Sequence, residues 1–363
     1  MTTPVPARPS RGSSRDELSI RHAGTRHLVA AFDKFRHTAK AADLCAGVGD
    51  VAWEAGWSCD PVPLGDGGEG TLDALAAQGG ILRTTTVSGP LGDPVLATWL
   101  LRGTTAFIEM ASASGLELVG GTEGNDALDA STYGTGELMV AALSVGAKRI
   151  VVALGGSATT DGGFGALRAM EPLPRFRGTK IVVACDVDTR FVDAATVFGP
   201  QKGASSLQVN LLTRRLQRLA DLYRSERGVD VRDVPGAGAA GGLAGGLLSI
   251  GATLTSGFAL VADETGLHEK MVGADLVVTG EGFVDDQSFN GKVVGGVCDL
   301  AAESGVGVLV IGGNVEQDLQ VPAAVAGHVH AVVSLVERFG EQRAWDDTLE
   351  CVRTVVQEHL AAI

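Results

Sequence analysis

Short apolar segments that each end in a polar, Gly-rich loop recur along this chain, and they constrain its fold more than any other feature. Two examples are HLVAAF (27–32), which is followed by DKFR, and RIVVAL (149–154), which is followed by GGSATTDGG. Helical patterns alternate with these segments, which is typical of α/β proteins. Because open α/β sheets bind ligands at the carboxyl ends of their strands, the loops are the expected place of a site.

The apolar periodicity predicts the individual elements of this α/β fold. Strands are predicted at 27–32, 58–64, 81–87, 96–101, 106–110, 149–154, 180–185, 275–279 and 306–311. Helices are predicted at 38–55, 71–78, 136–145, 207–224 and 345–361. The turn sequence SGPLGDP lies between two of the predicted strands, so a hairpin-like region is expected to interrupt the parallel pattern.

Length and charge narrow the classes of function. The chain has 363 residues, which favours about two domains. Its 43 acidic and 29 basic residues give a formal net charge of −14, which argues against nucleic acid or an anionic membrane as the main partner. The five cysteines are odd in number and lack paired spacing, so we expect reduced thiols in a cytoplasmic protein.

Two segments stand apart from the α/β pattern. Residues 1–25 are rich in Pro, Ser, Thr and Arg and have no continuous apolar run, so they predict a disordered leader and not a signal peptide. The stretch 234–262 carries no charge, yet its many glycines dilute the hydropathy that a membrane span needs. We therefore expect Gly-rich turns and a close-packed buried helix there.

Charged residues follow the first predicted strand directly. Asp33, Lys34 and Arg36 stand where this strand passes into a helix. Two cations beside a helix amino terminus with free N–H groups suit a bound anion. An ordinary solvated cap, with Asp33 capping the helix and both cations exposed, explains the same residues.

The loop LGDGGEGT (64–71) places two carboxylates among several glycines. The glycines let the backbone approach a ligand closely, while Asp66 and Glu69 suit Mg²⁺ or the hydroxyls of a sugar-like ligand. A capping box, with Asp66 as the N-cap and Glu69 at position N3 of the helix at 71–78, is the structural alternative. The two interpretations are compatible.

The loop LGGSATTDGG (154–163) combines glycines with hydroxyl side chains between a strand and a helix. Its bare amides and hydroxyls suit a phosphate, and Asp161 suits a metal or a hydroxyl ligand. A flexible strand-to-helix turn is the alternative.

Acidic residues and lysines also follow the later predicted strands. The segment TGEG (279–282) precedes Asp285 and Lys292, which suits a metal-plus-phosphate arrangement for phosphoryl transfer. A surface turn with a lysine at the start of a helix is the alternative. Asp186 follows another strand and is a candidate carboxylate. Lys202 in FGPQKG is either a phosphate contact or a solvated loop lysine.

Several common motifs are absent. The sequence around Gly291 and Lys292 does not match a Walker A motif. The segment GAGAAG (236–241) matches the dinucleotide pattern, but it follows a proline and a charged stretch, so a nicotinamide-dependent oxidoreductase is only an alternative. The sequence contains no HExxH, CxxC pair or GxSxG, so zinc and serine hydrolase chemistry lack support.

Taken in order, these segments resemble the bacterial glycerate kinase family, the type I glycerate 2-kinases. The matching stretches are PLGDGGEGTLDAL (63–75), VSGPLGDPV (87–95), FIEMASASGLELV (107–119), STYGTGEL (131–138), VVALGGSATTDGG (151–163), VACDVDTRF (183–191), VFGPQKGA (197–204), GAGAAGGLAGGLL (236–248) and ADLVVTGEGFVDDQS (274–288). The resemblance implies phosphorylation of D-glycerate to 2-phosphoglycerate, with ATP and Mg²⁺ as cofactors.

The resemblance also implies the domain organisation. We expect a Rossmann-like domain with a mostly parallel sheet, discontinuous in sequence, at 26–82, 125–172 and 264–363. A second, smaller mixed α/β domain is expected at 83–124 and 173–263, with the active site in the cleft between the two. The expected partner is a small hydroxyacid, without nucleic acid or membrane, and a homodimer is compatible with this picture.

The roles expected of individual residues follow from the loop chemistry together with the family resemblance. The expected catalytic carboxylates are Asp66, Glu69 and Asp186, and the expected metal ligands are Glu281 and Asp285. The residues expected to bind substrate or phosphate are Asp33, Lys34, Arg36, Gly67, Gly68, Gly155, Gly156, Ser157, Asp161, Lys202 and Lys292.

This sequence departs from the family pattern at the site itself. Lys34 stands where the family usually has Ser, and Phe283 stands where its GEG motif continues with Arg. Lys34 is a candidate replacement for the lost positive charge. Thr160 and Asn290 replace a usual Asn and a usual His. These changes leave a non-catalytic relative that binds a hydroxyacid as a further alternative.

Overall fold

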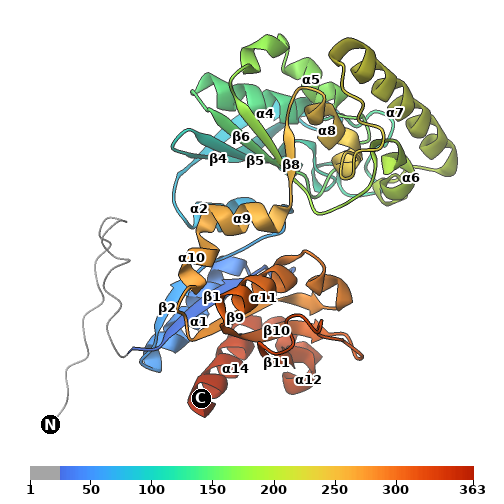
Figure 1. The fold of residues 1–363 in the computed structure, drawn as a ribbon. Coiled ribbons are helices and arrows are strands. Elements are labelled where there is room, and N and C mark those ends of the chain that lie inside the picture. Colours follow the sequence, from blue (N-terminus) through green and yellow to red (C-terminus); the bar gives the residue numbers. More distant parts are fainter. Residues whose placement is uncertain (1–24) are drawn as a thin grey trace.

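The computed structural model describes residues 25–363, which form two lobes that are each built on their own β-sheet (Figure 1). The lower lobe in this view holds a five-stranded sheet of order β11-β10-β9-β1-β2, and the upper lobe holds a six-stranded sheet of order β3-β4-β5-β6-β7-β8. The strands of the first sheet come from both ends of the chain, so the expected discontinuous α/β domain is confirmed. The predicted leader at 1–25 lies outside the described residues, apart from its last residue.

The sheet of the lower lobe is parallel throughout. Its strands are β1 (His27–Phe32), β2 (Ser58–Pro61), β9 (Leu276–Val284), β10 (Gly307–Val315) and β11 (Val329–Ser334). Helices α1 (Ala41–Glu54) and α14 (Thr348–Ala362) pack on one face, while α10 (Leu267–Met271) and α11 (Val293–Ser304) pack on the other. Strands covered on both faces need apolar residues throughout, which is why β1, β9 and β10 could be predicted as apolar runs.

The sheet of the upper lobe is mixed. It begins with an antiparallel meander of β3 (Ile81–Ser88), β4 (Pro94–Arg102) and β5 (Thr105–Glu109), and it continues with the parallel strands β6 (Arg149–Ala153), β7 (Lys180–Ala184) and β8 (Thr253–Thr255). This confirms the expected hairpin-like region. Strands β8 and β11 were not predicted, because both lie at the edge of a sheet and are only partly buried, so their apolar pattern is weak.

The helices of the upper lobe enclose a second core, and short helices complete both lobes. The helices that contribute buried residues to that core include α4 (Tyr133–Ser144), α5 (Phe164–Ala169), α7 (Ser206–Arg227) and α8 (Ala239–Leu248). The remaining short helices are α3 (Ala111–Ser114), α6 (Ala194–Phe198), α12 (Leu335–Phe339) and α13 (Glu341–Asp346), with 3₁₀ turns at Glu117–Val119, Leu173–Phe176, Phe191–Asp193, Pro200–Lys202 and Asp286–Phe289.

The segment 125–172 lies in a different lobe from the one expected. Its strand β6 pairs with β5 on one side and with β7 on the other, so it belongs to the six-stranded sheet. The physical reason is the helical crossover from β5 through α3 and α4 to β6, because consecutive parallel strands joined by such a crossover normally lie side by side. The assignment of 125–172 to the Rossmann-like domain is therefore wrong at the level of the sheets, and the second domain is larger than predicted.

Two connections join the lobes, and their helices lie between the sheets (Figure 1). Helix α2 (Thr71–Ala76) belongs to the first connection and contacts α9 (Gly257–Thr265) of the second. Leu72 and Leu75 of α2 share one buried cluster with Phe107 of the upper sheet and Val29 of the lower sheet. The lobes therefore share a hydrophobic core, which sets the relative position of their loops.

The glycines of 236–241 serve packing inside the upper lobe. Ala240, Gly241 and Gly242 have left-handed backbone angles at a kink within α8. A Cβ at Gly241 would lie 1.9 Å from the carbonyl oxygen of Thr159, so this glycine allows two backbone segments to touch. Between α7 and α8 the chain forms no strand that leads into these glycines, in agreement with the objection that the sequence raised against the dinucleotide interpretation. Within the described part of the chain, no helix is both long and apolar enough to cross a membrane.

A prediction concerns the ion pairs that fasten α9 to the upper sheet. Glu264 of α9 pairs with Arg102 of β4 and with Arg149 of β6, and all three side chains are largely buried. We expect Glu264→Ala to lower the free energy of unfolding by about 2 kcal/mol, because two guanidinium groups then lose their carboxylate. The control is Glu358→Ala, which breaks an exposed pair with Arg338 and should cost less than about 0.5 kcal/mol. Equal losses in urea unfolding would contradict the prediction.

Candidate active site

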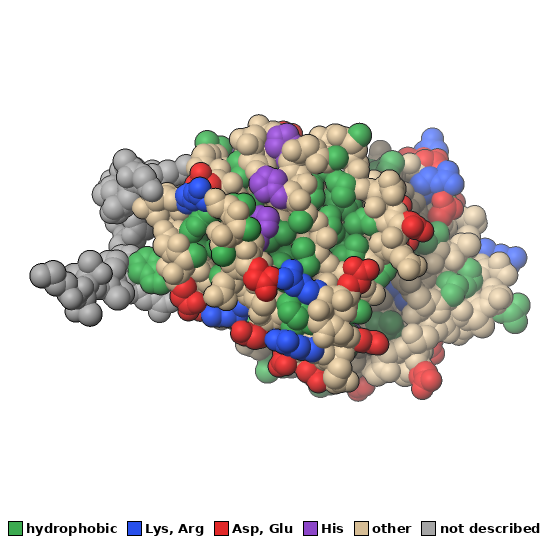
Figure 2. Space-filling view, turned by 90° about the horizontal axis from the view of Figure 1, so that it is seen from below, with side chains coloured by type: hydrophobic (Ala, Val, Ile, Leu, Met, Phe, Trp, Pro, Cys, Tyr) green, Lys and Arg blue, Asp and Glu red, His purple; other side chains and the backbone are tan. Residues whose placement is uncertain are grey.

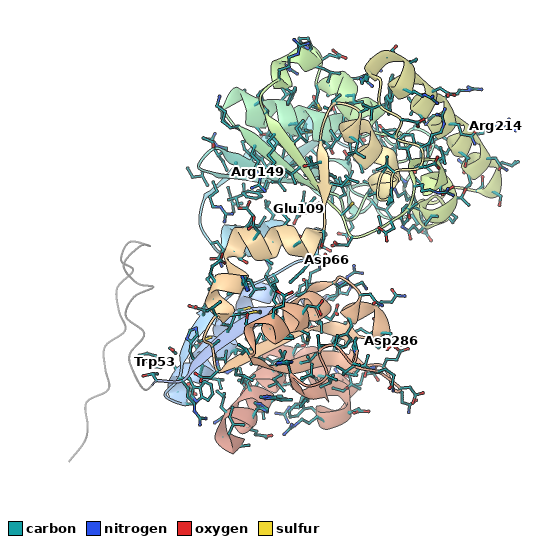
Figure 3. The ribbon with its side chains drawn as sticks, in the orientation of Figure 1. Trp53, Asp66, Glu109, Arg149, Arg214 and Asp286 are labelled. Carbon is teal, nitrogen blue, oxygen red and sulfur yellow. The ribbon has the colours of Figure 1, made fainter. Side chains whose placement is uncertain are left out.

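Loops from both lobes meet at the junction between the sheets. The lower lobe contributes the ends of β1 (33–36) and β9 (281–285) and the loop at 64–70, and the upper lobe contributes the ends of β6 (154–157) and β7 (185–186). Figure 3 shows Asp66 at this junction, between the two lobes, with Glu109 close above it. The predicted loops are therefore not scattered over separate surfaces.

Bare backbone makes this meeting possible. A Cβ at Gly155 would lie 2.4 Å from the Cα atom of Gly68, and the Gly155 N–H donates to the carbonyl oxygen of Gly67 over 3.4 Å. A Cβ at Gly257 would lie 2.0 Å from the carbonyl oxygen of Asp66. No side chain larger than that of glycine fits at these contacts, because real Cβ atoms do not approach other atoms so closely.

Four carboxylates lie close enough at the junction for their charges to interact. Burial raises the pKa of Asp33 from 3.8 to about 7, with smaller upward contributions from Asp66 and Glu281 and an opposing one from Lys34. Burial also raises the pKa of Glu281, and Asp66 adds to that rise. The pKa of Asp186 is raised by the packing around its carboxylate and further by Asp66, although the side chain as a whole is exposed.

Two lysines lie beside these acids, and Arg36 belongs to the same loop as the first of them. The Lys34 ammonium donates a short hydrogen bond to the carbonyl oxygen of Glu69, so it ties the first loop to the second. Lys292 lies close enough to Glu281 to lower the pKa of that carboxyl. Arg36 is exposed, and its backbone borders Gly282. Positive charge is therefore available at the rim of the acidic cluster, where an anionic ligand would need it.

The loop at 64–70 has a different structure from the predicted capping box. Helix α2 has Gly70 as its N-cap, with φ of 87° and no side-chain cap, and it ends at Ala76 rather than at Gln78. The Asp66 carboxylate instead accepts from the Gly68 N–H at 3.0 Å, which folds the loop tightly and leaves its other oxygen without a partner among the described contacts. Glu69 is exposed. Neither Asp66 nor Glu69 caps helix α2: Asp66 lies at the junction, and Glu69 is exposed to solvent.

Ser157, Lys202 and Asp161 form a second group inside the upper lobe. The Lys202 ammonium donates to the Thr159 carbonyl oxygen at 2.6 Å and to Ser157 Oγ at 3.3 Å. Complete burial lowers the pKa of Lys202 to about 7, against an upward contribution from Asp161. The alternative of a solvated loop lysine is therefore wrong, and this group connects to the junction through the segment 155–157.

Asp161 and Asp285 are occupied by hydrogen bonds within the chain. Asp161 accepts from the backbone N–H groups of Thr132, Gly163 and Gly165 at 2.9, 3.0 and 3.0 Å. Asp285 caps the 3₁₀ turn that follows β9, where it accepts from the N–H and the hydroxyl of Ser288 at 2.9 and 3.1 Å. These bonds involve both carboxylate oxygens of Asp161 and make it an organiser of turns, whereas at Asp285 they involve Oδ1 alone.

Two polar residues of the upper lobe were not predicted from the sequence, namely Glu109 at the junction and Asn125 beside the buried Lys202. Glu109 ends β5 and accepts from the Leu72 N–H at 2.7 Å, and Asn125 donates to the carbonyl oxygens of Ala158 and Lys202 at 3.0 and 2.8 Å. Glu109 lies in the stretch FIEMASASGLELV, and a carboxylate that ends an apolar strand was the available signal. Asn125 lies in no strand or helix, so no pattern marked it.

The donor set at the junction fits Mg²⁺. Among residues 25–363, no three His, Cys, Asp or Glu side chains lie close enough to hold a metal by themselves. Mg²⁺ usually takes only one or two carboxylates and completes its shell with water and substrate phosphates. Glu281 Oε1 is buried without a hydrogen-bond partner, which is the condition expected of an oxygen that awaits a ligand.

The far end of the lower lobe carries a separate groove that lacks this chemistry. Figure 2 shows this end of the molecule, where hydrophobic side chains gather between charged ones. The groove encloses about 270 Å³ and is lined by Leu309, Ala331, Val333, Arg338, Val355, Glu358 and His359. Its one lining carboxylate is paired with its one guanidinium, so the groove offers no acidic cluster comparable to that of the junction.

Comparisons with known proteins agree on one family. The model of the glycerate kinase family matches residues 28–173 and 171–363. The chain is 41% identical to glycerate 2-kinase of Escherichia coli K12 across 77% of this chain and 82% of the relative, and 37% identical to glycerate kinase of Bacillus subtilis 168 across 80% and 86%. A crystal structure of a candidate glycerate kinase 2 from Salmonella typhimurium LT2 matches with a TM-score of 0.81 and 32% identity, over 93% of this chain and 98% of that chain.

The raised pKa of Asp33 predicts how its replacement changes stability with pH. The unfolded carboxyl ionises near pH 3.8 and the folded one near about 7, so between these values only the unfolded chain has lost the proton. Wild-type stability therefore falls as the pH rises through this window and then levels off. Asp33→Asn keeps a hydrogen-bond acceptor for the Lys34 N–H and has no such titration.

We expect Asp33→Asn to gain about 2–3 kcal/mol of unfolding free energy over the wild type between about pH 5 and pH 8. Urea unfolding in the presence of EDTA measures this difference without interference from divalent metals. Asp43→Asn, an exposed change on α1, is the control and should follow the wild type at every pH. Parallel stability curves for Asp33→Asn and the wild type would contradict the prediction.

Proposed function

This chain belongs to the glycerate kinase family, and we propose that it transfers the terminal phosphoryl group of ATP to a hydroxyl of D-glycerate, giving 2-phosphoglycerate. The family match covers nearly the whole described chain, and the relatives named above are glycerate kinases. The observation that carries the proposal is the meeting of acidic and basic loops from both lobes around Asp66. Phosphoryl transfer requires little covalent chemistry from a protein and depends mainly on positioning and charge.

The carboxylates divide between the acceptor and the metal in this proposal. Asp66 receives the proton of the acceptor hydroxyl, and Asp186, which lies beside Asp66 and is accessible, helps to orient that hydroxyl. Glu69, exposed on the same loop, lies at the edge of the acceptor site. Glu281, with its unpartnered oxygen, would hold Mg²⁺ together with Asp33. The Mg²⁺ ion would neutralise charge on the nucleotide phosphates.

The cations and the glycine-rich backbone account for the anionic groups. Lys34, Arg36 and Lys292 surround the acidic cluster and would balance the charge of the phosphates and of the glycerate carboxylate. The backbone N–H groups of Gly67 and Gly156 would cradle phosphate oxygens, whereas those of Gly68 and Gly155 already donate within and between the loops. Ser157 and the buried Lys202 support this loop from inside the upper lobe.

The setting of the enzyme is part of the proposal. The free thiols of the chain, Cys45, Cys59, Cys185, Cys298 and Cys351, suit a reducing cytoplasm. The net charge of −14 fits a small anionic substrate held in a local basic rim better than a nucleic acid. A homodimer would be detected by light scattering after size-exclusion chromatography.

The proposed function predicts a specific loss at Asp66. In a coupled assay for ADP release with D-glycerate, ATP and Mg²⁺, Asp66→Asn should lower kcat by about 10²–10⁴-fold, because the hydroxyl loses its proton acceptor. The amide still accepts from the Gly68 N–H, so the thermal midpoint should stay close to that of the wild type. Asp286→Asn is the control, since Asp286 lies at the outer side of the lower lobe, away from Asp66 (Figure 3).

Three outcomes would decide against this assignment. Near-normal turnover of Asp66→Asn removes that carboxylate from the site. An absence of ADP release from the wild type across a panel of small hydroxyacids overturns the kinase itself. Binding of D-glycerate without ADP release, measured by calorimetry, would instead favour the non-catalytic relative.

A further prediction concerns the metal. We expect Glu281→Gln to raise the Mg²⁺ concentration needed for half-maximal turnover by at least about tenfold, because an amide oxygen is a weaker ligand than a carboxylate. Saturating Mg²⁺ should restore much of the activity. Glu316→Gln is the control and should leave the Mg²⁺ requirement unchanged, because within residues 25–363 the side chain of Glu316 accepts only from the Asp286 N–H.

A further inference from the structure

Helix α2 begins directly after the Asp66 loop and has no cap of its own. Its N-cap residue is Gly70, which has no side chain to accept from the first N–H groups of the helix. The Thr71 N–H reaches the Gly68 carbonyl oxygen at 3.3 Å. A helix of six residues with uncovered N–H groups is marginal by itself, so its start depends on an acceptor from elsewhere.

That acceptor comes from the other lobe. Glu109 is the last residue of β5 in the upper sheet, and its Oε1 accepts from the Leu72 N–H at 2.7 Å. Figure 3 places Glu109 between the upper sheet and Asp66, at the level of the helices that join the lobes. A carboxylate of one lobe thus caps the helix that anchors the catalytic loop of the other.

The position of Glu109 is costly for a charged group. Burial raises the pKa of its carboxyl, and Asp73 and Glu69 add to that rise, whereas Lys34 and the Leu72 N–H oppose it. The surroundings are otherwise apolar, with Leu75, Phe107 and Val151 lining the same small cavity. The hydrogen bond from the Leu72 N–H offsets part of the cost of placing this carboxylate there.

We propose that Glu109 is a positioning residue, which holds the loop at 64–70, and with it Asp66, against the upper lobe by capping α2 across the lobe junction. The inference rests on the proposed function in so far as Asp66 acts on the acceptor hydroxyl. Its structural consequence is independent of the reaction: the order of the loop depends on the contact between the lobes. Glu109 touches no reacting atom in this scheme.

The test compares three variants of the full chain. Glu109→Ala removes the cap, whereas Glu109→Gln keeps an oxygen that accepts from the Leu72 N–H and removes only the charge. Glu137→Ala is the matched control, because Glu137 of α4 accepts in the same way from the Ser88 N–H, at 2.6 Å, but lies wholly within the upper lobe. The readouts are amide hydrogen exchange of the segment 64–76 without ligands, kcat and KM for D-glycerate and ATP, and the thermal midpoint.

For Glu109→Ala we expect at least about tenfold faster exchange in 64–76 and at least about tenfold lower kcat, with KM for ATP within about threefold of the wild type. Glu109→Gln should lie within about threefold of the wild type in both readouts, since the cap is retained. Glu137→Ala should lower the thermal midpoint by a similar amount to Glu109→Ala, while exchange of 64–76 and kcat stay unchanged.

Each contrary result overturns the inference. It fails if Glu109→Ala leaves the exchange of 64–76 unchanged, if Glu137→Ala alters kcat equally, or if Glu109→Gln is as impaired as Glu109→Ala. A wild type that releases no ADP with any hydroxyacid would overturn the proposed function alone, because the exchange measurement still decides whether Glu109 orders the loop.

Discussion

Contact between bare backbone segments of the two lobes is the constraint on which the site depends. Gly155 of the upper lobe meets Gly68 of the lower lobe so closely that a Cβ on the former would lie 2.4 Å from the Cα of the latter. Gly257 approaches the Asp66 carbonyl oxygen in the same way. These contacts bring N–H groups and acidic side chains of different lobes within reach of one small ligand, which separate surfaces could not do.

The electrostatics of the junction follow from this packing. Loops that touch exclude water, so burial raises the pKa of Asp33 and of Glu281. A cation bound beside these carboxylates would stabilise their charged form more strongly than it would in water. Lys34 and Lys292 oppose this rise without cancelling it. A site of this kind favours ligands that bring their own balance of charge, as a nucleotide with its metal does.

The local sequence pattern was sufficient to predict most strands and helices. It failed to predict contacts between residues that are far apart in the chain. The buried strand β9 was predicted from its apolar run, whereas β8 was not, because it is short and lies at an edge. A capping box at Asp66 was consistent with the local sequence. In the structure Gly70 is the N-cap of α2, and the acceptor for the Leu72 N–H is Glu109, 37 positions away. The sequence made Asp161 a candidate ligand, but its carboxylate accepts hydrogen bonds from three backbone N–H groups that belong to two segments of the chain.

The sequence by itself determined the α/β class, most strands and helices, the glycine-rich loops at their ends and the resemblance to a kinase family. These follow from periodicity and local turn chemistry, which act between residues a few positions apart. Only the tertiary structure decided that 125–172 joins the upper sheet, that Lys202 is buried, and which carboxylates face the junction. The physical reason is that segments distant in the chain determine the burial and the hydrogen-bond partners of a side chain. A carboxylate can bind a ligand only when no such segment already donates hydrogen bonds to its oxygens.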